Sequence, residues 1–374
     1  MIYLIGEGEL FKESTSGKFK YSSVEECISY FSSKDSIQVD TETKGKDSHS
    51  KPILSLQLGD SENQWVIDVR TTNILLFKEL LESKEVVLHN SKFDYKFLKH
   101  SGIILNKIYD TMLAECIIYC GYDKWGYGLA ALTKRYLNIE LDKTTRGEFF
   151  KIEQGKPFTD KQIEYAALDV AYLHKIQAMQ MEKINKYDLN YCLALECEVV
   201  KALADIEYNG MYLNAEKWLI NTEDYVSAVK DLEIQMDEVL LEEPKVTKHL
   251  PLNTQMTLFG EKERELMINY SSPIQIKFIC NLLGYDVDTT NDRELEKLVN
   301  KHEFFRLIQE YRKANKVVTT YGKSFLDSIN STTGRVHTSF WQVLNTGRVS
   351  SGSKDDNAPN LQNIPASNTF RNCF

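Results

Sequence analysis

The first half of the chain alternates short apolar runs with helical patterns. Three runs rich in β-branched residues, each bounded by polar turns, predict successive strands at 36–43, 52–59 and 64–69. A helical pattern at 73–83 and a short apolar run at 85–89 follow them. Strands that alternate with helices in this way favour an α/β domain, a mixed sheet flanked by helices.

Helical patterns continue to the end of this half. Three of them are short, at 93–102, 110–120 and 128–137. Residues 158–185 predict one long helix, because Thr159 followed by Gln162 has the spacing of a capping box at its start. The opening residues 1–11 predict a first edge strand.

Beyond residue 186 the strand signals largely disappear. Helical patterns cover 193–210, 215–243, 273–284, 293–300 and 304–329, with more irregular polar sequence at 244–272. The last stretch returns to strand and loop patterns. We therefore expect three parts, at 1–186, 187–334 and 335–374.

Composition narrows the class of protein but not its partner. The chain has 374 residues, of which 42% are hydrophobic and 26% charged, a profile typical of soluble globular proteins with room for two domains. No apolar run reaches the length that crosses a bilayer. The formal charge of −9 does not exclude a nucleic-acid partner, because acids can be concentrated in a metal site while basic residues form local patches.

The cysteines indicate the compartment. Seven are scattered without a CxxC pair, which predicts free thiols in a reducing, cytoplasmic environment.

Four acids have a spacing that suggests a shared site. Asp40 and Glu42 lie two residues apart on a predicted strand, so both side chains leave on one face. Asp94 follows the point where an apolar strand turns into a helix. Asp169 comes four residues after Tyr165 on the capped helix and shares its face. Three elements could thus bring four carboxylates together.

Clustered carboxylates repel one another unless cations neutralise them. Oxygen ligands favour magnesium or manganese over zinc, and two such ions roughly 4 Å apart suit phosphodiester hydrolysis. An isolated DxE or YxxxD pattern arises by chance in many chains. The order and context of the four acids therefore carry the prediction of a site with two Mg²⁺ or Mn²⁺ ions.

The segments VDTET, HNSKFDYKFL and YAALD resemble the three exonuclease motifs of the DEDD superfamily, in its tyrosine-containing branch, over about residues 35–180. The resemblance implies a ribonuclease H-like fold and 3′-5′ proofreading exonuclease activity. In this family pattern Asp40, Glu42 and Asp169 would ligate the tighter metal, with Asp40 also reaching the second. Asp94 would hold the second metal. Tyr165 would orient the attacking water, because a phenol with a pKa near about 10 is poorly matched to act as the base at neutral pH.

The same resemblance suggests substrate contacts. Asn90 would bind the 3′-terminal nucleotide, and Phe93 or Phe158 could stack on bases, a sequence-tolerant contact that suits an editing enzyme. Phe93 fits a core position equally well.

The second half is similar to the thumb and early palm of family A DNA polymerases. The matching segments are LADIEYNGMYLN, SSPIQIKFICNLLG, EYRKANKVVTTY, GRVHTSFWQ and TGRVSSGSKDDNAPNLQNIP. The loop between SS and PNLQNIP is longer than usual, which leaves its contacts open. In this family the region grips the primer–template duplex. Arg348 would reach the minor groove, and Asn360, Gln362 and Asn363 would contact sugar or base edges, where the acceptors are degenerate across base pairs.

The sequence ends at residue 374, before the position expected for the first metal-binding aspartate of the palm. We therefore expect an incomplete palm and, as partner, a C-terminal polymerase fragment that carries palm and fingers. The rival explanation is a truncated fragment of a longer polymerase. The start of the sequence directly at the exonuclease fits a phage-type enzyme by analogy. Two other functions remain open at this point: a stand-alone RNA or DNA 3′-end trimming exonuclease, and a non-catalytic DNA-binding subunit.

Overall fold

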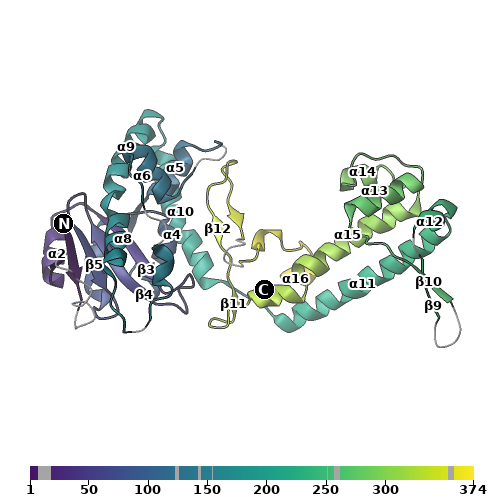
Figure 1. Ribbon diagram of the computed structural model, residues 1–374, viewed down its shortest axis with the longest axis horizontal. Coiled ribbons are helices and arrows are strands. Elements are labelled where there is room, and N and C mark those ends of the chain that lie inside the picture. Colours follow the sequence, from purple (N-terminus) through teal and green to yellow (C-terminus); the bar gives the residue numbers. More distant parts are fainter. Residues whose placement is uncertain are drawn as a thin grey trace. The chain divides into compact units, whose positions relative to one another are not determined.

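The structure is a computed structural model that forms two compact units (Figure 1). It describes residues 1–6, 18–122, 126–141, 145–153, 155–250, 252–256, 262–352 and 358–374. The first unit comprises Met1–Met211 and Asn330–Gln362, and the second comprises Tyr212–Ile329 and Asn363–Phe374. Helix α10 and residues 330–362 thus belong to the unit with the sheet, whereas the sequence patterns had placed them in the second and third parts.

A mixed sheet forms the centre of the first unit. Its strands in chain order are β1 (Ile2–Ile5), β2 (Lys20–Tyr21), β3 (Ser36–Thr43), β4 (Ile53–Gly59), β5 (Gln64–Asp68), β6 (Glu85–Leu88) and β7 (Lys107–Asp110). In space the order is β2-β1-β5-β4-β3-β6-β7. Strand β4 pairs antiparallel with both β3 and β5. Strand β6 pairs parallel with β3, and β7 pairs parallel with β6. The predicted mixed sheet is confirmed, but β1 is not an edge strand, because β2 pairs outside it.

Helices cover both faces of this sheet. They are α2 (Val24–Ser32), η1 (Ile74–Phe77), α3 (Lys78–Ser83), α4 (Ser91–His100), α5 (Thr111–Ile118), α6 (Leu129–Leu137), α7 (Arg146–Phe149), α8 (Asp160–Ala171), α9 (Leu173–Lys186) and α10 (Asn190–Asn209). The capping box of Thr159 and Gln162 is present at the start of α8. The single long helix predicted from 158 to 185 is wrong: it breaks at Tyr172, which lets α8 lie on β3, β4 and β5 while α9 packs against α5 and α6.

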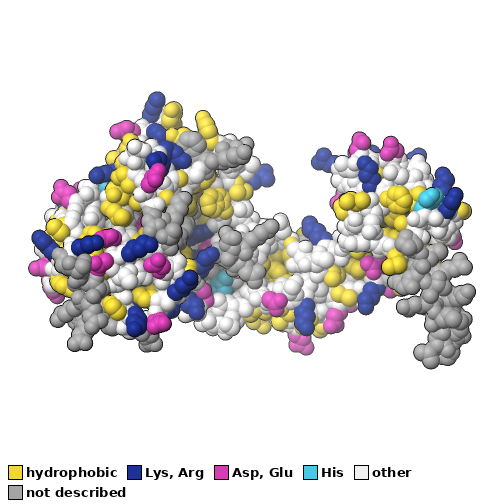
Figure 2. All heavy atoms as spheres, in the orientation of Figure 1, with side chains coloured by type: hydrophobic (Ala, Val, Ile, Leu, Met, Phe, Trp, Pro, Cys, Tyr) yellow, Lys and Arg dark blue, Asp and Glu magenta, His cyan; other side chains and the backbone are white. Residues whose placement is uncertain are grey.

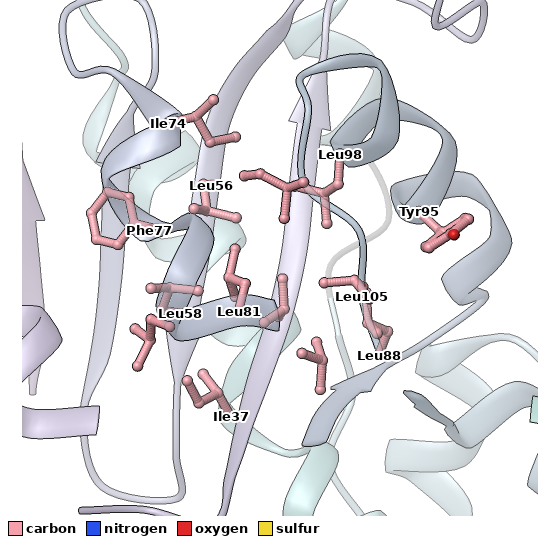
Figure 3. Close-up of a cluster of buried hydrophobic side chains, with 14 of the residues drawn as sticks. Ile37, Leu56, Leu58, Ile74, Phe77, Leu81, Leu88, Tyr95, Leu98 and Leu105 are labelled. Carbon is pink, nitrogen blue, oxygen red and sulfur yellow. The ribbon is translucent and has the colours of Figure 1, made fainter. Parts of the chain in front are cut away.

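The core explains why β4 is apolar along its whole length. All seven of its residues are buried, since helices lie on both sides. On one face Leu56 and Leu58 pack with Phe77 and Leu98 (Figure 3). On the other face Leu54 packs in a cluster with residues of α8. The central strands are therefore fixed between two layers of helix.

The second unit is mainly helical, as predicted. Its elements are α11 (Ala215–Leu241), α12 (Pro244–His249), β9 (Leu252–Met256), β10 (Lys262–Leu266), α13 (Pro273–Leu282), α14 (Asp292–Glu296), α15 (Glu303–Tyr321), η2 (Lys323–Ser328) and α16 (Asn368–Arg371), and β8 (Met211–Tyr212) precedes them. The long helices α11 and α15 pack against each other. The antiparallel pair β9–β10 was not foreseen, because 244–272 showed no alternating apolar pattern.

Short elements complete the first unit: β11 (Arg335–Val336), β12 (Phe340–Trp341), β13 (Ser350–Ser351) and η3 (Leu361–Asn363). Strands β12 and β13 pair antiparallel, with Phe340 opposite Ser351. The longer loop foreseen between SS and PNLQNIP falls largely on 353–357, outside the described residues.

Two general features accompany this fold. All seven cysteines are free thiols, as predicted. In the part of the chain that the structure describes, no helix combines the length and apolar character needed to cross a bilayer.

Candidate active site

Strand β3 presents the first two acids on one face. Asp40 and Glu42 alternate with Thr41 along the strand, so their side chains point to the same side of the sheet. The strand lies between β4 and β6, which fixes its position on both edges. Asp40 is half-buried, and Glu42 is 6% exposed. A carboxylate this deeply buried needs compensating partners.

Helix α8 supplies the third acid. Its Ile163, Ala166 and Val170 are buried and fix the orientation of the helix on the sheet. That orientation carries Asp169 to β3. One carboxylate oxygen from each of Asp40, Glu42 and Asp169 lies within 4.8 Å of the others, a spacing that could hold a metal ion.

Asp94 lies next to this group but outside it. It is in the first turn of α4 and 3% exposed. Its Oδ1 accepts hydrogen bonds from the backbone N–H of Thr41 at 3.1 Å and from Thr41 Oγ1 at 2.6 Å. Thr41 stands between Asp40 and Glu42, so Asp94 is tied to the same stretch of β3. No local pattern predicts this role of Thr41, because its partner is 53 positions away.

We expect Thr41→Val to destabilise the first unit by roughly 1–3 kcal/mol. The substitution keeps the shape of the side chain but leaves a buried carboxylate without one of its donors. Urea unfolding followed by fluorescence measures the difference. Thr43→Val is the matched control: Thr43 lies on the same strand and is equally buried, but its hydroxyl donates to the neutral carbonyl of Gly45. Equal losses in the two variants would contradict a special role for the Thr41–Asp94 bond.

Tyr165 lies one helical turn before Asp169 on the same face of α8, as its spacing predicted. It is half-buried, and its ring centroid is 6.3 Å from that of Phe149. The phenol is thus held on the face of α8 that carries Asp169.

Asn90 forms the turn between β6 and α4. Its backbone is left-handed, with φ of 62° and ψ of 49°, a conformation that asparagine tolerates better than most residues. The carboxylate of Asp110 holds this turn, because it accepts the N–H of Asn90 at 3.1 Å and that of Ser91 at 2.7 Å. Asp110 is 1% exposed and also caps α5. Asp110 was not predicted as a site residue, although an aspartate directly before a helix is a capping signal.

The two predicted stacking residues differ in their surroundings. Phe93 is half-buried, packs against the core and lies 5.0 Å from Phe97, ring to ring. Phe158 is 1% exposed, and the guanidinium of Arg70 covers its ring at 4.0 Å from the centroid. This burial does not support a stacking role for Phe158, because neither face of its ring is open to a base.

A pocket lies beside the turn at Asn90. Lys92 and Asp110 line it together with residues 340–343 and Cys116. Burial lowers the pKa of Lys92 and raises the pKa of Cys116 to about 12. Cys116 is thus a packing residue at neutral pH rather than a thiolate ligand.

The predicted duplex contacts lie on the surface. Arg348 is exposed, and so are Asn360, Gln362 and Asn363. Two of these polar side chains also stabilise their own loop: Gln362 Oε1 accepts the N–H of Ser351 at 2.9 Å, and Asn360 Oδ1 accepts the N–H of Gln362 at 3.0 Å. Lysines and arginines alternate with acids over the visible face of the first unit, so charge alone marks no DNA path there (Figure 2).

Together the mixed sheet and the acids on strand β3 and helix α8 define an α/β domain of the nuclease class, and comparison with known proteins makes this specific. The family model for the 3′-5′ exonuclease matches residues 19–185, and the model for DNA polymerase family A matches residues 257–374. Residues 19–185 therefore form a domain of the 3′-5′ exonuclease family and residues 257–374 match part of DNA polymerase family A, which confirms the resemblance seen in the motifs.

The curated relatives are bacterial DNA polymerases I. That of Borreliella burgdorferi is 26% identical over 352 residues, which cover 88% of this chain and 35% of the relative. Those of Caldicellulosiruptor bescii and Aquifex aeolicus are 28% and 26% identical, and the matches cover 30% and 54% of their lengths. The chain therefore spans about a third to a half of the relatives it matches.

A solved structure has the same fold. It is the POL domain of Pol1 from M. smegmatis in complex with DNA primer-template and dNTP. The match covers 100% of this chain and 57% of that one, with a TM-score of 0.71 and 20% sequence identity.

Proposed function

We propose that this chain removes nucleotides from the 3′ ends of DNA by metal-dependent hydrolysis, as the proofreading part of a DNA polymerase. The convergence of Asp40, Glu42 and Asp169 carries the proposal, because it occurs inside the segment that matches the exonuclease family. Carboxylate oxygens at this spacing form a donor set suited to a hard divalent cation.

Each residue has a distinct role in this proposal. Asp40, Glu42 and Asp169 would hold one Mg²⁺ or Mn²⁺ ion, and Asp40 and Asp94 would hold a second. When bound, such ions lower the pKa of an attacking water and stabilise charge on the departing 3′ oxygen. Tyr165 would orient that water.

The substrate strand would be positioned by residues at the start of α4. Asn90 is the N-cap residue of that helix and would contact the terminal nucleotide. Phe93 is half-buried and would stack on a base. Neither contact reads sequence, which suits an enzyme that edits any mismatched end.

A single-stranded DNA with a 5′ label tests the proposal. With Mg²⁺ we expect a ladder of products that shorten from the 3′ end, and no products with EDTA. The RNA strand of the same sequence should be digested more slowly. Faster digestion of RNA would favour the rival function of RNA trimming, and no shortening of either strand would favour a non-catalytic DNA-binding subunit.

Replacing Tyr165 by phenylalanine should lower the turnover number by roughly tenfold to a hundredfold, because the water loses a positioning group while the metal ligands remain. Tyr172→Phe, at another half-buried tyrosine seven positions further along, serves as the control and should stay near the wild-type rate. Steady-state digestion of the labelled strand measures both. A wild-type rate in Tyr165→Phe would remove the phenol from the mechanism.

The match of residues 257–374 to DNA polymerase family A supports a second activity. We propose that the exposed Arg348, Asn360, Gln362 and Asn363 contact a primer–template duplex. We also propose that nucleotidyl transfer uses palm and fingers residues that a second, C-terminal polypeptide supplies. Primer extension by a mixture of the two polypeptides tests this, and a mixture that binds duplex but never extends the primer would reject complementation.

A further inference from the structure

Glu207, near the end of α10, is a buried carboxylate that joins three segments. It is 2% exposed. Lys92 and Lys96 of α4 both donate to it, the latter at 2.6 Å. The backbone N–H of Phe340 in β12 donates to it at 2.6 Å. Glu207 lies between the two matched segments, which end at 185 and begin at 257, so neither family match includes it.

The two lysines attach α4 to this carboxylate through ion pairs. Lys92 and Lys96 are one helical turn apart and therefore share a face of α4. Without Glu207 two partly buried cations would face each other, and the N–H of Phe340 would lose its partner. Removing one member of a buried ion pair is strongly destabilising for this reason.

The segment around Phe340 is itself fixed to α10. Lys92 also donates to the carbonyl of Phe340. Gly210 ends α10 with φ of +59° and lies directly against residues 336–337. A Cβ added to it would be 2.8 Å from His337 and from the carbonyl oxygen of Val336. His337 Nδ1 lies 2.7 Å from the carbonyl oxygen of Glu207. Glu207 therefore lies where α4, α10 and β12 meet, and β12 is within the segment that matches DNA polymerase family A.

Helix α4 is also the helix of the candidate site. Its first turn holds Asp94, which bonds to Thr41 on β3, and its N-terminal turn is Asn90. Lys92 lies between these two residues. A shift of α4 would move both of them relative to Asp40.

We propose that Glu207 is a positioning residue for exonuclease hydrolysis: it holds α4 in the place where Asp94 and Asn90 act, and it links that place to the polymerase-family strand at Phe340. The inference rests on the proposed exonuclease function. It assigns no contact between Glu207 and the substrate.

The test uses the full chain with Glu207→Gln, which keeps the shape and an acceptor for Phe340 but removes the charge. The matched control is Asp205→Asn. Asp205 also pairs with a lysine of α4, Lys99, but its side chain is 44% exposed and does not bond to Phe340. Exposed pairs of this kind contribute little to stability. For Glu207→Gln we expect the turnover number on single-stranded DNA to fall at least tenfold with KM changed less than threefold, and for Asp205→Asn both should stay within twofold.

Binding of Mn²⁺ alone, followed by the EPR signal of the free ion, provides a readout independent of turnover. Glu207→Gln should weaken the binding of Mn²⁺ at least threefold, and Asp205→Asn should not. Lys96→Met leaves Lys92 and the N–H of Phe340 bonded to Glu207, so it should weaken the binding of Mn²⁺ by a smaller factor. If Glu207→Gln does not fold, Lys96→Met decides whether Glu207 positions α4. Wild-type turnover and Mn²⁺ binding in both Glu207→Gln and Lys96→Met would overturn the inference. Absence of nuclease activity in the wild type would instead reject the proposed function, and Mn²⁺ binding would still decide the role of Glu207.

Discussion

Asp40→Ala should reduce 3′-end hydrolysis by about a thousandfold or more, equivalent to roughly 4 kcal/mol of lost transition-state stabilisation. Asp40 is the acid expected to contact both metal ions, and its carboxylate lies within 4.8 Å of those of Glu42 and Asp169. Alanine removes the ligand and leaves the remaining acids less able to retain cations. Single-turnover digestion of a labelled strand measures a loss of this size.

The control for this variant is Asp35→Ala. Asp35 is an exposed acid directly before β3, at the other end of the strand from Glu42. The Asp35→Ala variant should digest DNA at the wild-type rate. Full activity in Asp40→Ala would mean that the hydrolysis comes from another site or from a contaminating nuclease.

Trp218→Ala should destabilise the second unit by about 3–5 kcal/mol. Trp218 is 0% exposed and lies on α11. Its indole stacks on Phe325 at 4.7 Å between centroids and meets the edge of Phe370 at 4.8 Å. Its Nε1 donates to the carbonyl of Tyr321 at 2.9 Å. Alanine would leave a large cavity and a buried carbonyl without its donor.

Thermal and urea unfolding monitored by circular dichroism measure this loss. Phe278→Ala is the control within the same unit, because Phe278 is 43% exposed and its removal leaves no enclosed cavity. It should cost less than about 1 kcal/mol. If Trp218→Ala were as stable as Phe278→Ala, the second unit would not depend on this aromatic cluster.

Local patterns predicted the parts of the site that depend on local structure. The alternation along β3 placed Asp40 and Glu42 on one face, and the capping box with its helical spacing placed Asp169. Strands β3, β4 and β5 were each predicted from their own residues, because β-branched runs between polar turns leave few alternatives.

Contacts between distant segments could not be predicted in this way. The bond from Thr41 to Asp94 joins positions 53 apart, and those from Lys92 and Lys96 to Glu207 join positions 115 and 111 apart. The break at Tyr172 likewise follows from packing, since the two halves of the predicted helix rest on different neighbours. Phe158 belongs to the core because Arg70 and Phe149 pack against it. No sequence pattern near Phe158 predicts either contact.

The position of a bound metal tests the central claim most directly. A crystal of the chain soaked in Mn²⁺, with anomalous diffraction recorded at the manganese edge, locates the ion without any assumption about activity. The account predicts a peak about 2.0–2.2 Å from carboxylate oxygens of Asp40, Glu42 and Asp169. Manganese bound only elsewhere, with these three acids unliganded in a crystal whose protein digests DNA, would contradict it.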